Sequence, residues 1–71
     1  MKIIIAGAGE VGTHLAKLLS REEQDIILID NDEEKLRELD ANYNLMTVIG
    51  NPTAFQTLKQ AQVYKADLFI A

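Results

Sequence analysis

A cluster of three glycines near the start of the chain constrains the fold more than any other sequence feature. The cluster follows the β-branched run at 2–6 and precedes a helical pattern that begins at Val11. Between a strand and a helix, glycines at GxGxxG spacing are typical of a phosphate-binding turn. The first allows a tight turn, the second lets a pyrophosphate approach the backbone, and the third lets the helix pack closely on the sheet. A glycine-rich turn with a structural role alone is the alternative. The candidate turn consists of Gly7, Ala8, Gly9, Glu10, Val11 and Gly12.

Four short, mainly apolar segments have the composition of buried parallel strands. Such runs suit strands that are covered by helices on both faces of a sheet, because every side chain is then buried. Turn residues or charged residues bound each run. The expected strands span residues 2–6, 25–30, 45–49 and 67–71.

Amphipathic helical patterns lie between these strands. The first helix has one apolar face, formed by Val11, Leu15, Leu18 and Leu19. Asn31 or Asp32 is expected to cap the second helix, because both side chains can accept hydrogen bonds from the first turn. The inner face of that helix is expected to carry Leu36, Leu39 and Tyr43. A third helix is expected after Gly50, with Phe55 and Leu58 pointing inward.

The order of these elements predicts the fold class. Strands that alternate with helices through short connections form a parallel sheet, so βαβαβαβ predicts an α/β, Rossmann-like doubly wound sheet. We expect one domain over residues 1–71. A complete fold of this type usually has five or six strands, so the chain is expected to form the N-terminal portion of such a fold.

Asp30 is the second part of the nucleotide signature. It ends the second predicted strand, eighteen residues beyond Gly12, where a carboxylate can accept hydrogen bonds from the ribose hydroxyls of an adenosine. The same charge would repel a 2′-phosphate, so NAD(H) is expected over NADP(H). We include Asn31 beside it among the candidates. A solvated carboxylate is the alternative for Asp30, and helix capping accounts for Asp32.

Asn51 and Thr53 follow the third predicted strand, at the edge where an adenine would rest. Asn51 has a second interpretation, because asparagine at the N-cap followed by Pro52 at the first helical position is a typical helix start. The two interpretations are compatible. We therefore include both residues as candidates and expect the third helix to begin at this point.

Conventional catalytic and metal-binding groups are scarce. His14 is the one histidine, and its position on the first helix predicts a surface side chain. Glu10 would lie at the mouth of the pocket, although a carboxylate also favours a helix N-terminus for its own sake. Without cysteine and with a single histidine, a zinc site of the usual kind is excluded. We expect no catalytic residue and no metal ligand in this chain.

Composition narrows the classes of partner further. The net charge is −4, and seven basic residues are scattered among eleven acidic ones, which argues against nucleic acid as a ligand. No stretch approaches the roughly 20 apolar residues of a membrane span. The apolar run at 2–6 is too short for a signal peptide and is followed at once by glycines. These features indicate a cytoplasmic globular protein.

With these residues in place, the chain resembles the N-terminal half-domain of TrkA-type potassium-uptake regulators, the RCK or KTN domains. The glycine motif alone is shared with many dehydrogenases. The combination of Gly9-Glu10-Val11-Gly12 with Gly50-Asn51 and the Ala66-Asp67 strand is more selective. The likeness runs along the whole chain, in segments 5–16, 19–22, 25–30, 48–51 and 66–71.

The resemblance implies a regulatory subunit that is peripheral to the inner face of the plasma membrane and docks on a membrane potassium-translocating subunit. It implies a pocket for NAD(H), or for ATP or ADP, where ligand exchange moves paired domains and controls ion flow. Asp30 would hold the ribose, and Asn51 with Thr53 would border the adenine. The next motif of the family would begin at Ala71, so half of the nicotinamide side is expected outside this chain. The residues implied around the phosphates are Gly7, Gly9, Glu10, Val11 and Gly12.

Two functional classes remain open from the residues alone. One is a ligand-sensing module without chemistry of its own, and the other is the cofactor half of an NAD-dependent oxidoreductase whose catalytic residues lie further on. The resemblance favours the sensor. We also expect a homo-oligomer, a dimer or larger, because an uncovered fourth strand would be an exposed edge that recruits partners.

Overall fold

A computed structural model describes residues 1–22 and 24–71 of the chain, without the side chain of Phe55. No helix in these ranges is long and apolar enough to cross a membrane. The 3-10 turns are η1 (Ser20–Glu22) and η2 (Val63–Lys65). The strands and α-helices, in chain order, are β1 (Lys2–Ala6), α1 (Glu10–Leu19), β2 (Asp25–Asp30), α2 (Glu33–Asn42), β3 (Met46–Ile49), α3 (Phe55–Gln60) and β4 (Leu68–Ile70).

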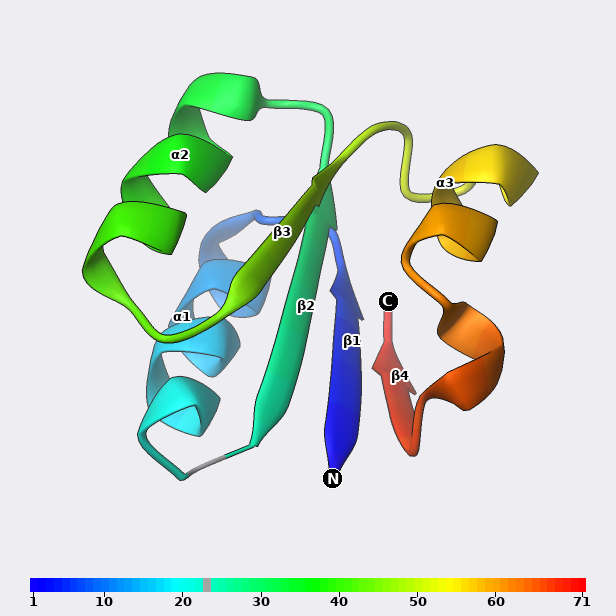
Figure 1. The fold of residues 1–71 in the computed structure, drawn as a ribbon. Coiled ribbons are helices and arrows are strands. Elements are labelled where there is room, and N and C mark those ends of the chain that lie inside the picture. Colours follow the sequence, from blue (N-terminus) through cyan, green and yellow to red (C-terminus); the bar gives the residue numbers. More distant parts are fainter. Residues whose placement is uncertain (23) are drawn as a thin grey trace.

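The four strands form one parallel sheet in the order β3-β2-β1-β4. Ile4 on β1 pairs with Ile27 on one side and with Phe69 on the other. Helices α1 and α2 cover one face of the sheet, and α3 with η2 lies on the other (Figure 1). This arrangement confirms the Rossmann-like doubly wound sheet. Because the strands are parallel, all four end at the same edge, here called the carboxyl edge, and all four begin at the amino edge.

Two layers of core explain why the strand sequences are continuously apolar. Successive side chains of a strand point to opposite faces, so Ile3 and Ile5 pack toward α1 and α2 while Ile4 packs toward α3. Ile4 and Ile29 are fully buried, and full burial of each such side chain stabilises the fold by roughly 1.5–3 kcal/mol. The α1–α2 layer contains Ile3, Ile5, Ala8, Ala16, Ile26, Leu28, Leu36, Leu39 and Leu45.

The first two strands and the second helix follow the sequence expectations. The bounds of β1 and β2 match residues 2–6 and 25–30, whereas β3 and β4 are shorter than the predicted 45–49 and 67–71. Asp32 is the N-cap of α2, and its side chain accepts a hydrogen bond from the Lys35 amide at 3.1 Å. Leu36 and Leu39 are buried, and Tyr43 packs against them in the α1–α2 layer.

The start of the third helix differs from the prediction. Helix α3 begins at Phe55 with Ala54 as its N-cap, so the expected N-cap at Asn51 is wrong. The Asn51 side chain instead accepts hydrogen bonds from the backbone N–H of Thr53 at 2.9 Å and from its hydroxyl at 2.8 Å. An asparagine that bonds two residues ahead forms a turn of its own. Leu58 packs into the α3 layer, and the expectation for the Phe55 side chain lies outside the described residues.

Helix α1 packs on the sheet through only part of the apolar face that its pattern predicts. Val11 is 74% exposed and Leu18 is 46% exposed. Ala16 is fully buried, and Leu15 and Leu19 pack against the core. The small residues Gly12 and Ala16, four apart, let the helix come close to the sheet. As a result, part of the apolar stripe turns toward solvent.

Candidate functional site

The glycine turn joins β1 to α1 at the carboxyl edge. Gly7 has φ +114°, a conformation that side chains rarely adopt, and its amide donates to the carbonyl oxygen of Ile29 at 2.8 Å. A Cβ at Gly12 would overlap the carbonyl oxygen of Gly7 and touch the Ile5 side chain. The turn therefore requires glycine at its first and last positions, for conformation at one and for space at the other.

The N-terminus of α1 is open. Gly9 is its N-cap, and no side chain in the described part of the chain accepts a hydrogen bond there, whereas the Asp32 side chain caps the start of α2. A Cβ placed on Gly9 would meet no atom within 4 Å, so the backbone is accessible. The first amides of a helix lack partners within the helix and carry partial positive charge. This end of α1 has the features of an anion-binding site of the kind found at nucleotide phosphates.

An open pocket of about 450 Å³ lies beside the turn. It occupies the carboxyl edge between α1 and the neighbouring strands β1 and β4. Among the residues that the structure describes, Glu10 is the one titratable side chain of its lining, and the rest is backbone or apolar surface. The lining residues are Ile5, Ala6, Gly7, Gly9, Glu10, Val11, Gly12, Leu15, Ile70 and Ala71.

Asp30 ends β2 next to the turn and is bonded to the backbone through both carboxylate oxygens. Oδ2 accepts from the Ala8 amide at 2.7 Å, and Oδ1 accepts from the Asp32 amide at 2.8 Å. Burial alone would raise the pKa of Asp30. Hydrogen bonds from the backbone, together with the positive charge of Lys35, outweigh that effect and hold the pKa below its ordinary value. The side chain is therefore a carboxylate at neutral pH.

The loop after β3 is hydrogen-bonded to the backbone of Asp30, so it lies at the same edge of the sheet as the glycine turn. The carbonyl oxygen of Asp30 accepts from the Gly50 amide at 2.9 Å, and the Asn51–Thr53 turn follows directly. Both Asn51 and Thr53 are exposed there, as is Asn31 after β2. The structure thus brings all the predicted site residues to the carboxyl edge. Ala8 is buried, and its backbone amide is bonded to Asp30.

Sequence reasoning did not name several residues that complete this region. Ile70 and Ala71 line the pocket because β4 pairs with β1, where the strand order reverses. The doubly wound topology could have indicated these two residues, because ligands bind where the strand order reverses. The charge of Lys35 acts on Asp30. Nothing in the sequence indicated this contribution beyond the position of Lys35 in the first turn of a helix.

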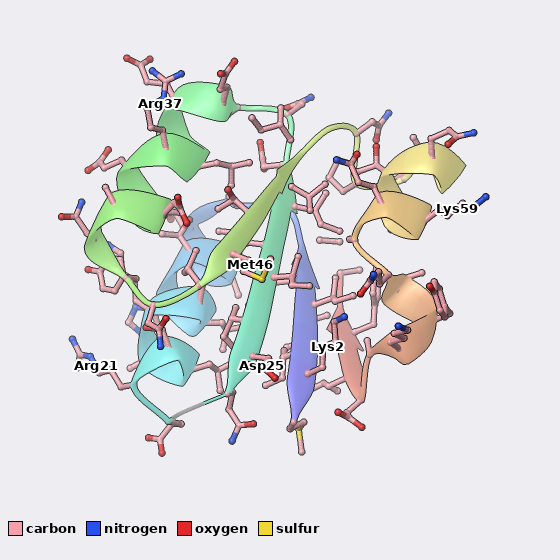
Figure 2. All side chains as sticks on the ribbon, in the orientation of Figure 1. Lys2, Arg21, Asp25, Arg37, Met46 and Lys59 are labelled. Atoms are coloured by element: carbon pink, nitrogen blue, oxygen red, sulfur yellow. The ribbon has the colours of Figure 1, made fainter. Side chains whose placement is uncertain are left out.

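Two other hollows lie outside the turn pocket. His14 is exposed and lines a cleft of about 310 Å³ together with Glu10, Thr13, Lys17 and Lys35, and Glu10 also lines the turn pocket. The second hollow, also of about 310 Å³, lies at the amino edge. Lys2 and Asp25 mark that edge at the starts of β1 and β2 (Figure 2). Its lining residues are Lys2, Gln24, Asp25, Ile26, Ile27, Asn44, Leu45, Met46 and Gln62.

A parallel sheet in this order, a glycine turn that enters an open helix and an aspartate at the end of the next strand together define a Rossmann-type nucleotide-binding domain. Residues 3–71 match the sequence model of the TrkA-N domain. The chain belongs to the TrkA-N domain family, which confirms the resemblance found in the sequence.

Similar proteins include several potassium uptake proteins. The chain is 48% identical over its full length to the Trk system potassium uptake protein TrkA of Halomonas elongata and 45% identical to that of Haemophilus influenzae. It is 35% identical to a Trk system potassium uptake protein TrkA homolog of Methanothermobacter thermautotrophicus. In each comparison the whole chain is covered, but it spans 16% of the first two relatives and 33% of the third. None of these names describes an enzyme.

Proposed function

We propose that this chain is the nucleotide-binding module of a regulatory subunit of a potassium uptake system. The module binds NAD(H), or ATP or ADP, at the carboxyl edge. The subunit is cytoplasmic and lies against the inner face of the plasma membrane, where it docks on a potassium-translocating membrane subunit and controls ion transport. The identity to Trk system proteins over the full chain supports the link to potassium uptake.

The main support for a nucleotide ligand is the open N-terminus of α1 beside the Asp30 carboxylate. The free amides after Gly9 suit a pyrophosphate, and Asp30 suits the ribose hydroxyls. In the same proposal Glu10 and Val11 border the phosphates, and Asn31, Asn51 and Thr53 border the adenosine. The negative charge of Asp30 disfavours a 2′-phosphate and therefore NADP(H).

The identity to Trk system proteins supports a sensor over an oxidoreductase. Hydride transfer needs an acid–base group close to the substrate. Among the described lining residues, Glu10 is the one titratable side chain, and His14 faces a different cleft. In a sensor, two ligands that share one pocket act as a switch when they bind two assemblies with different affinities.

Calorimetric titration tests the ligand assignment. We expect NADH to bind, NADPH to bind at least tenfold more weakly, and Asp30→Ala to remove that preference. Asp25→Asn is the matched control: it neutralises an aspartate on the same strand at the opposite edge (Figure 2) and should leave both affinities unchanged. Equal affinity of the unsubstituted protein for NADH and NADPH would contradict the assignment of Asp30.

A transport assay tests the regulatory role. The chain would replace the corresponding segment of a Trk system TrkA protein in cells that lack their own copy, with potassium-dependent growth as the readout. We expect growth to be restored by the unsubstituted chain and lost with Gly9→Ala, whose Cβ meets no atom of the protein and stands where a pyrophosphate would approach. Growth that is independent of the segment would contradict the proposed role.

A further inference from the structure

We propose that Asp30 is a positioning residue for the phosphate-binding turn, in addition to any contact with the ribose. The inference deepens the proposed function and rests on it for the identity of the ligand. It starts from the contacts of the carboxylate in the structure, which join two loops of the carboxyl edge. Oδ2 holds the turn after β1 through the Ala8 amide, and Oδ1 holds the start of α2 through the Asp32 amide.

The Ala8 contact fixes the turn at its centre. Ala8 lies between Gly7, which has the unusual φ of +114°, and Gly9, the N-cap of α1. On one side the Gly7 amide is bonded to Ile29, and on the other the Thr13 hydroxyl donates to the Ala8 carbonyl oxygen at 3.0 Å. Asp30 is the one side chain described as accepting from the Ala8 amide. Without it, that amide would lose its partner. Among the described contacts, the Gly7–Ile29 bond would then be the one hydrogen bond left between the turn and β2, so the free amides at α1 would be held less firmly.

A positioning role and a ribose contact predict opposite effects on a ligand that has no ribose. Inorganic pyrophosphate is such a ligand, and it repels a nearby carboxylate. If Asp30 contacts ribose alone, its removal leaves pyrophosphate binding unchanged or makes it tighter. If Asp30 positions the turn, its removal weakens pyrophosphate binding despite the loss of negative charge, because the donor amides are no longer preorganised.

The first experiment compares pyrophosphate affinity in three variants of the full chain. We expect Asp30→Ala to weaken pyrophosphate binding by about tenfold, the size of one lost charge-assisted hydrogen bond. Asp30→Asn keeps one acceptor oxygen for the Ala8 amide and should recover most of the affinity. Asp25→Asn should match the unsubstituted protein. Unchanged or tighter pyrophosphate binding by Asp30→Ala overturns the proposal.

The second experiment needs no ligand, so it separates this inference from the proposed function. In an NMR pH titration of the unsubstituted protein, the Ala8 and Asp32 amides should both titrate with the pKa of Asp30, which lies below its ordinary value. The charged groups placed around Asp30 are Lys35 and Asp32, with Glu10 in the cleft beside Lys35. The Asp32 carboxylate itself accepts from the Lys35 amide in α2, so the Ala8 amide is the decisive probe.

In Asp30→Ala, the resonances of Gly7, Ala8 and Gly9 should shift and their amides should exchange faster with solvent, while those of the core strands stay in place. If the Ala8 amide does not titrate and the turn is unchanged in Asp30→Ala, the positioning role is wrong even if NADH binds. If the amide titrates but no nucleotide binds, the positioning role holds and the proposed function fails.

Discussion

Three glycines occupy one turn, yet the structure of the protein itself requires glycine at only two of these positions. Gly7 has a backbone conformation that side chains avoid, Gly12 has no space for a Cβ, and Gly9 has both an ordinary conformation and open space. Substitutions at different glycines of this motif should therefore separate effects on stability from effects on ligand binding.

At Gly9, substitution should affect binding far more than stability. A Cβ at Gly9 touches nothing in the protein, so Gly9→Ala should change the free energy of unfolding by less than about 1 kcal/mol. The same Cβ would stand where a pyrophosphate approaches, and NADH affinity should fall by tenfold or more. Calorimetry and urea unfolding check the two effects. His14→Ala, on the same helix but outside the pocket, is the control and should change neither. Undiminished NADH binding by Gly9→Ala would mean that the phosphates lie elsewhere.

At Gly12, substitution should affect stability first. The added Cβ of Gly12→Ala overlaps backbone of Gly7, so α1 must move away from the sheet. Overpacking of this kind typically costs about 1–3 kcal/mol, a large share of the stability of a small domain. Thermal unfolding with and without NADH checks this effect. A melting temperature equal to that of Gly9→Ala would show that the helix does not pack as closely as described.

At the scale of elements, the two larger helices begin in different ways. Helix α2 is closed by the Asp32 side chain, and α1 has no side-chain cap. Asp32→Ala should destabilise the protein by about 1 kcal/mol through the loss of the cap, with little effect on pyrophosphate binding. Urea unfolding measures the loss, and Asn31→Ala, one residue earlier and without a capping bond, serves as the comparison. Equal stability of the two variants would show that the Asp32 cap contributes nothing.

The element bounds also show what the sequence could and could not predict. The β1 and β2 segments are uninterrupted apolar runs that end at a glycine turn or an aspartate, so their bounds were predictable from composition. The start of α3 was not, because Asn51 can cap a helix or form a turn with Thr53, and local geometry decides between them. The exposure of Val11 and Leu18 was not predictable either. Periodicity identifies an apolar helix face, but it does not say which part of that face the sheet covers.

The candidate site was also predictable from the sequence only in part. The glycine turn and Asp30 were predictable because their spacing is fixed by the fold. The hydrogen bond from the Ala8 amide to Asp30 was not, since it depends on how two loops meet at the carboxyl edge. The contributions of Ile70 and Ala71 to the pocket required knowledge of the strand order.

At the scale of the whole molecule, Asp30 links stability to pH. Its pKa is lower in the folded protein than its ordinary value, so its contribution to stability is present above the unfolded pKa and is lost as pH falls through the folded pKa. The free energy of unfolding should therefore decrease below about pH 4, and Asp30→Asn should show a weaker decrease from a lower value at neutral pH. Urea unfolding between neutral and acid pH measures both slopes. Identical slopes would show that Asp30 is not coupled to folding.

The apolar edge of the molecule leads to a prediction about assembly. On the edge strand β4, Leu68 is 45% exposed and Phe69 is 41% exposed, and an unpaired strand edge promotes association. The chain should self-associate as its concentration rises, and Phe69→Lys should weaken this association. Sedimentation velocity checks it, with Tyr64→Lys as the control because Tyr64 is exposed on η2 and not on the edge strand. A monomer at every concentration would contradict the expected homo-oligomer.

The most direct test of the central claim is to map NADH onto the protein by NMR chemical-shift perturbation. The nucleotide-binding account predicts that the largest changes fall on the amides of Gly9, Glu10 and Val11, with smaller ones at Asp30 and Asn51, all at the carboxyl edge. Changes concentrated at Lys2, Gln24 and Asn44 would place the ligand in the hollow at the amino edge and would contradict the account.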